Sequence, residues 1–298
     1  MSQNDTSKEE NVDVNRRGIF ARAGLGAVAL GAMASAGAIL PSAPVQAQGI
    51  SDVDIFNFAL NLEYLEAEFY LRAATGQGLA ASDTTGTGAL GAVTGGSRVP
   101  FQSTYVRQYA EKIAIDEQVH VKFIRAVLGG SAVARPAIDL QQSFTTLALA
   151  AGLIVPGQTF NPFADEISFL LGAFVFEDVG VTAYGGAASL ISNRDLLSYA
   201  ASVLAVEAYH GGAIRALLAN LGGQATVSRI TALRSVLSGA DDERGISFQG
   251  NNYFIAPTDQ QGQTFRRSPR QVLNIVYGGV NATSGLFFPS AMNGTIRA

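Results

Sequence analysis

Apolar side chains recur every three or four residues over much of the chain, which is the spacing that lines one face of a helix. This period predicts four long helices, over residues 52–74, 101–128, 164–191 and 194–221. It also predicts three short helices, over residues 141–153, 226–237 and 268–276. Four helices of more than 20 residues each favour an all-α fold built as a four-helix bundle. No strand pattern is evident before Gly245.

The remaining segments are rich in small and polar residues. Residues 75–100 contain many Gly, Thr and Ala residues without any period, which predicts a long loop. Residues 240–298 contain many Gly, Asn, Gln and Pro residues, which predicts a mostly irregular C-terminal extension packed on the bundle. The bundle with its short fifth helix is therefore expected over residues 48–239.

Residues 1–47 are predicted to be an export signal. A polar start ends in Arg16-Arg17, a Gly- and Ala-rich apolar run follows over residues 23–40, and Ala47 ends a small-x-small cleavage site. The arginine pair resembles the twin-arginine signal, although two flanking residues depart from its pattern; Sec export or an uncleaved anchor are the alternatives. No later stretch is expected to be long, apolar and uncharged enough to span a membrane. We therefore expect an exported protein, periplasmic or extracellular.

Composition narrows the classes of function. Of the 298 residues, 48% are hydrophobic and 15% charged, which excludes a disordered chain. A net charge of −4 and the lack of any basic run exclude a nucleic-acid partner. The absence of cysteine excludes disulfides, thiolate zinc sites and iron–sulfur clusters. Any imidazole chemistry must use His120 or His210, the two histidines of the chain.

Each histidine follows a glutamate by three residues, in Glu117-Gln118-Val119-His120 and in Glu207-Ala208-Tyr209-His210. Residues three apart project from one face of a helix, so each pair can direct a carboxylate oxygen and an imidazole nitrogen at one point. Fe, Mn and Zn accept such mixed ligands. A lone histidine is more often a surface or core residue, but the repeated spacing favours metal ligands.

A second repeated spacing accompanies the first. Tyr70 follows Glu63 by seven residues, and Tyr184 follows Glu177 by seven, which places each tyrosine two turns along its glutamate's face. Each such pair precedes a Glu-x-x-His motif, so two helix pairs repeat one another. Glu66 is the alternative to Glu63 on the first helix. The tyrosines are candidates for hydrogen bonding to the ligands or for redox roles, with plain core packing as the alternative.

The pattern resembles the ferritin-like di-metal carboxylate proteins, in which two helices give one Glu each and two give Glu-x-x-His. This resemblance covers about residues 52–221 and implies a ferritin-like four-helix bundle. The metal ligands it implies are Glu63, Glu117, His120, Glu177, Glu207 and His210. It further implies that Glu117 and Glu207 bridge two ions. The tail motif Arg267-Ser268-Pro269-Arg270 is similar to that of exported, desiccation-associated ferritin-like proteins.

The resemblance implies a site for two Fe or Mn ions, with O₂ or peroxide as substrate. The chemistry expected there is oxidation of Fe(II) or dismutation of peroxide. The alternative is a stress- or desiccation-protective structural protein whose metal site is mainly structural or vestigial, so whether the protein is an enzyme is left open. Assembly as a homo-oligomer is left open as well.

Overall fold

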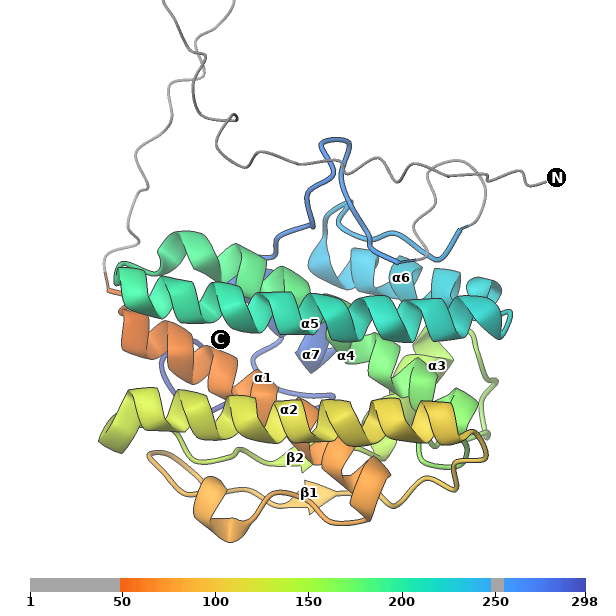
Figure 1. Cartoon of the computed structure of the whole chain (residues 1–298), viewed down its shortest axis with the longest axis horizontal. Helices are drawn as coiled ribbons and strands as arrows, with labels where there is room; N and C mark the ends of the chain where they lie inside the picture. The colour runs from red at the N-terminus through yellow and green to blue at the C-terminus, as the bar shows by residue number, and fades with distance from the viewer. Residues whose placement is uncertain (1–48, 248–254) are drawn as a thin grey trace, which may run out of the picture. The chain divides into compact units, whose positions relative to one another are not determined.

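The computed structural model describes residues 49–247 and 255–298 (Figure 1), and the predicted export signal lies outside the described residues. The four long helices are α1 (Asp52–Thr75), α2 (Thr104–Leu128), α4 (Glu166–Ala187) and α5 (Arg194–Asn220). The short helices are α3 (Gln142–Ala150), α6 (Gln224–Ser238) and α7 (Pro269–Tyr277), with 3₁₀ turns at Ala81–Asp83, Gly129–Ser131 and Ala188–Leu190. The predicted all-α bundle is confirmed.

Side-chain caps fix where the long helices begin. The capping residues are Ser51, Ser103, Asp165 and Asn193. Ser103 and Asp165 each accept a hydrogen bond from a backbone N–H three residues on, so α2 and α4 begin two or three residues later than the apolar period predicts. α1 ends at Thr75 and is capped by Gly76, whose φ of 82° suits glycine.

The bundle consists of two helix pairs, with α1 packed against α2 and α4 against α5. α1 and α4 are the inner helices, and α5 lies in front of α4 in Figure 1. Residues Glu166–Leu190, which include α4, are long and apolar enough to cross a membrane by length and composition alone. The expectation that no later segment has this property is therefore wrong. α4 is apolar on all sides because α1, α5, α6 and α7 all pack against it, as in a core helix.

The structure also contains a small sheet. Strands β1 (Val93–Thr94) and β2 (Ile138–Asp139) pair in parallel and join the loop after α1 to the segment before α3. The prediction of no strand before Gly245 is therefore wrong. Strands of two residues are too short to produce a period of alternating apolar residues, so the sequence carries no signal for them.

The C-terminal extension is held to the bundle by a chain of buried ion pairs. Alternating cations and anions run from α5 through α4 and α6 to the extension, in the order Arg215, Asp178, Arg234, Glu243, Arg267 and Asp242. Three arginines thus face three carboxylates, and the charge of this buried group is balanced. Arg267 is 1% exposed and contacts both Asp242 and Glu243, the two carboxylates at the extension end of this series of ion pairs.

The backbone of the extension also lies directly on α4. The Arg267 backbone N–H donates to the Thr182 carbonyl at 3.0 Å, and its guanidinium donates to the Thr182 hydroxyl at 2.8 Å. A Cβ at Gly186 would lie only 1.9 Å from the Arg267 carbonyl oxygen. Glycine at position 186 therefore permits this close approach.

We expect Arg267→Ala to destabilise the fold by about 3–5 kcal/mol, because it leaves two buried carboxylates with an unbalanced charge. The matched control is Arg266→Ala, which removes an exposed neighbour and should cost no more than about 0.5 kcal/mol. Urea unfolding of both variants measures the difference. Equal stability of the two would show that the ion chain does not hold the extension.

Candidate metal centre

Each long helix places one buried carboxylate at the centre of the bundle. These are Glu63 on α1, Glu117 on α2, Glu177 on α4 and Glu207 on α5, none more than 1% exposed. His120 and His210 lie one helical turn beyond the glutamates of α2 and α5 and are also buried. The structure therefore brings together all six residues that the sequence singles out.

The candidate ligand atoms form two overlapping groups, and within each group all atoms lie within 4.8 Å of one another. The first group contains Glu63, Glu117, His120 and Glu207, and the second contains Glu117, Glu177 and His210. Among the described residues, Glu117 alone belongs to both groups, so its carboxylate is shared between them. His120 Nδ1 lies 3.2 Å from Glu63 Oε2, and His210 Nδ1 lies 3.0 Å from Glu117 Oε1.

Eight buried side-chain atoms of these six residues make no hydrogen bond, although each imidazole Nδ1 lies within 3.6 Å of carboxylate oxygens of the cluster. They are Glu63 Oε2, both oxygens of Glu117, His120 Nδ1, Glu177 Oε2, both oxygens of Glu207, and His210 Nδ1. Leaving a buried polar atom without a partner costs about 1–3 kcal/mol. Carboxylate oxygens and imidazole nitrogens that converge in this way suit Fe or Mn ions, so the donor set fits a pair of such ions.

The electrostatics of the cluster show the cost of this convergence. Burial and the surrounding carboxylates raise the pKa of Glu207 well above its ordinary value, and burial raises the pKa of Glu177 to about 8. Burial alone would lower the pKa of both histidines, but the carboxylates raise it to about 11 for His120 and about 9 for His210. Burial alone would raise the pKa of Glu117, but the two imidazoles lower it to about 2. Two divalent cations would balance the four carboxylate charges.

Tyr70 and Tyr184 connect the two inner helices at the site. Tyr70 on α1 donates to Glu177 Oε1 on α4, and Tyr184 on α4 donates to Glu63 Oε1 on α1. Each tyrosine lies two turns from one glutamate, as the sequence predicts, but it binds the glutamate of the other helix. These bonds leave the Oε2 atoms of Glu63 and Glu177 without partners and inside the cluster. The tyrosines therefore orient two candidate ligands.

Comparison with known proteins agrees with this arrangement. The model of the ferritin-like domain family matches residues 51–220. The chain belongs to the ferritin-like family. It is similar to a ferritin-like catalase of Nesocodon mauritianus, with 27% identity over 270 residues, 83% of this chain and 85% of that protein. It is also similar to a desiccation-related protein of Craterostigma plantagineum, with 35% identity over 173 residues, 56% of this chain and 53% of that protein. The resemblance seen in the sequence is confirmed.

Glu66 is a fifth buried carboxylate beside the ferritin-like cluster. It lies one turn along α1 from Glu63 and belongs to neither ligand group. Burial, and after it the charge of Glu117, raises its pKa well above the ordinary value. The structure thus places Glu63 among the candidate ligands and Glu66 outside them. Glu68 forms ion pairs with two arginines away from the cluster.

Gly180 occupies the position on α4 that Glu66 occupies on α1, because each lies three residues after a candidate ligand. A Cβ at Gly180 would lie 2.3 Å from Glu207 Oε2 and 3.4 Å from Glu66 Oε1. The missing side chain therefore leaves the space that both carboxylates border. Gly180 was not predicted as a site residue. Aligning the two helix pairs of this ferritin-like bundle would have shown it at the position equivalent to Glu66.

Asp116 makes the two histidines unequal. Its Oδ2 lies 3.1 Å from His210 Nε2, so the Nε2–H can bind the carboxylate while Nδ1 faces the cluster. The residue at the matching position before Glu207 is Val206, which cannot bind His120 in this way. Asp116 was not predicted either, because its contact crosses from α2 to α5.

We expect Gly180→Ala to weaken metal binding at least about 10-fold, because the new Cβ displaces the flexible end of Glu207. Alanine favours a helix interior over glycine by about 1 kcal/mol, so the fold itself should survive. The matched control on α4 is Gly185→Ala, whose Cβ would meet its nearest neighbour at an ordinary 3.4 Å. Titration of Mn(II) or Fe(II) into both variants tests this. Equal affinities would exclude Glu207 from the ligand set.

Proposed function

We propose that this protein binds two Fe or Mn ions and disproportionates hydrogen peroxide. The observation that carries the proposal is the convergence of eight unpartnered buried atoms from four helices. The similarity to a protein named ferritin-like catalase, which extends over most of both chains, supports peroxide as the substrate.

The side chains at such a centre would have different roles in binding the ions and in positioning the ligands. Glu63, Glu117, His120 and Glu207 would hold one ion, and Glu117, Glu177 and His210 the other. When bound, the two ions would supply the exchange of electrons by which one peroxide is oxidised to O₂ and another is reduced to water. The tyrosines hold two carboxylates in place, and Asp116 holds the His210 ring.

A second candidate function is supported by the similarity to a desiccation-related protein at 35% identity. In that case the metal would chiefly stabilise the bundle, because a ligand that binds the folded state alone stabilises it by mass action. The same six residues would serve both functions. The two functions differ in whether the loaded protein turns over peroxide.

The test uses the full chain loaded with Mn(II) or with Fe(II). We expect about two ions per chain and O₂ release from peroxide, both lost in the double variant His120→Ala/His210→Ala, because imidazole ligands are removed from both groups. The control, Glu111→Gln, removes a charge from an outer position on α2 and should change neither measurement.

Metal binding without O₂ release, together with a large fall in melting temperature on chelation, would support the structural function and overturn the catalytic one. Unchanged metal content in the double histidine variant would overturn the site itself. Oxidation of Fe(II) without turnover of peroxide would identify a ferroxidase.

We further propose that the protein is exported already folded, through its Arg16-Arg17 pair. Copper and zinc bind mixed nitrogen and oxygen sites more tightly than iron or manganese, so folding around the metal before export would avoid competition outside. Changing both arginines to lysine should leave folded, metal-bound precursor in the cytoplasm, as cell fractionation would show. Export and cleavage of this variant at the normal rate would favour the Sec route.

A further inference from the structure

A small apolar cavity lies between α1, α4 and α7, next to the metal centre. Its lining is apolar except for Glu66, and one wall comes from the C-terminal extension through Ile275 and Phe287. Gly180 also lines it, and a Cβ there would lie 2.3 Å from Glu207 Oε2. The cavity therefore ends at Glu66 and Gly180, and Gly180 lies next to the candidate ligand Glu207.

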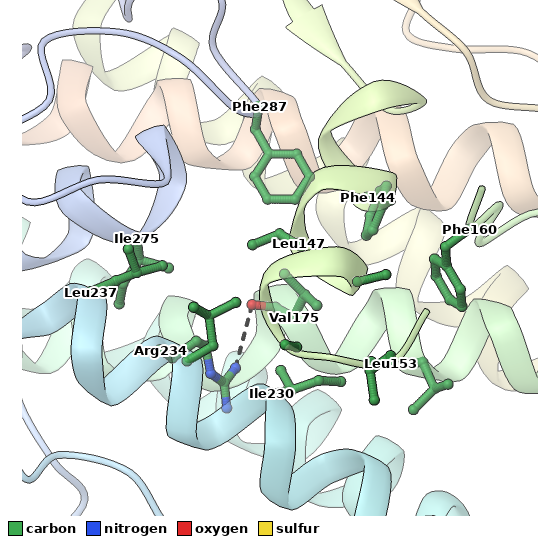
Figure 2. A pocket seen from close by; sticks show the side chains of 14 residues that line it. Phe144, Leu147, Leu153, Phe160, Val175, Ile230, Arg234, Leu237, Ile275 and Phe287 are labelled. Atoms are coloured by element: carbon green, nitrogen blue, oxygen red, sulfur yellow. Dashed lines mark hydrogen bonds between the residues drawn. The ribbon is translucent and has the colours of Figure 1, made fainter. Parts of the chain in front are cut away.

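A second apolar pocket adjoins the first and leads outward between α3, α4, α6 and α7 (Figure 2). The two share Val175, Ile275 and Phe287 as lining residues. The outer pocket also includes Leu153 and Phe160, which are only half-buried, so it reaches the surface. The two spaces therefore lie side by side, and apolar residues line both of them between the surface and Glu66.

The one charged side chain that lines the outer pocket, Arg234, already has hydrogen-bond and ion-pair partners. The Arg234 guanidinium donates to the Phe174 carbonyl at 2.8 Å and to the Val175 carbonyl at 3.4 Å, the bond drawn in Figure 2. It also pairs with Asp178 and Glu243. The pocket therefore presents no free cation to an anionic ligand, and its walls favour an apolar molecule.

We infer that these two spaces form a path for dioxygen between the metal centre and the outside. Apolar cavities stay dry, and a peroxide molecule entering one would lose its hydrogen bonds to water, whereas O₂ has none to lose. Both cavities are small and apolar, so they suit a small apolar molecule rather than a bulky or charged ligand. This inference rests on the proposed function, in which two H₂O₂ give two H₂O and one O₂.

A polar contact lies on the other side of the cluster. There, on the α2 and α5 side, Asp116 is partly exposed, contacts His210 and pairs with the exposed Lys112. A polar substrate would keep its hydrogen bonds along that side. The structure thus assigns polar reactants and apolar gas to different sides of the centre.

Xenon, an apolar atom that enters dry cavities, reports on the path without any turnover. We expect crystals of the full chain under xenon pressure to show xenon in the cavity beside Glu66. Val175→Phe, which fills the junction of the two spaces, should abolish that xenon. A separate apolar pocket beside Tyr184, lined by Ile55 and Ala59 and sharing none of the three junction residues, should keep its xenon and serves as the internal control.

Ile275→Phe fills the same junction from α7, so the test does not depend on one variant folding. The control substitution is Val236→Phe on α6, at a side chain that is 70% exposed. In metal-loaded protein the junction variants should release O₂ from peroxide several-fold more slowly at unchanged metal content. Absence of xenon beside Glu66 in the parent, or unchanged xenon in both junction variants, overturns the path. Xenon in the cavity without any peroxide turnover supports the path and overturns only the proposed catalysis.

Discussion

Four carboxylates brought together in an apolar core are the constraint on which the rest of this structure depends. Two like charges 4 Å apart repel by about 4 kcal/mol even when the surroundings screen as strongly as a protein surface does. The raised pKa values of Glu177 and Glu207, and of His120 and His210, show how strongly the cluster favours added positive charge. Protons on the imidazoles neutralise part of the negative charge, and two divalent ions would neutralise all of it.

The internal repeat explains both the symmetry of the site and its departures from symmetry. Two helix pairs supply the same ligand types at the same spacing, and the two tyrosines bind reciprocally between α1 and α4. The symmetry fails at two pairs of equivalent positions: Gly180 on α4 corresponds to Glu66 on α1, and Val206 on α5 corresponds to Asp116 on α2. At the first pair, only α1 contributes an additional buried carboxylate. At the second pair, only Asp116 binds a histidine, His210. The two ions would therefore not be equivalent.

The features that the sequence predicts are those encoded within a single helix. The Glu-x-x-His spacing and the two-turn Glu–Tyr spacing depend only on helix geometry, so His120, His210 and their glutamates were placed correctly on shared faces. Each tyrosine binds the glutamate of the other helix, and this depends on how α1 and α4 are rotated against one another. The spacing of residues along one helix gives no information about that rotation. The Asp116 contact and the buried ion chain of Arg267 likewise join segments distant in sequence. The apolar length of α4 was misjudged because its burial comes from neighbours on every side.

The C-terminal extension completes the surroundings of the centre from a position beyond the family's matched region, which ends at residue 220. Arg267 fixes its course over α4, and α7 and Phe287 then cover the part of α1 and α4 that faces away from α2 and α5. This cover keeps water from one side of the carboxylates, which strengthens their repulsion and hence their demand for cations. It also leaves the polar side near Asp116 as the approach for molecules that need hydrogen bonds. The same segment therefore contributes to the strength of the metal centre and to the separation of its polar and apolar approaches.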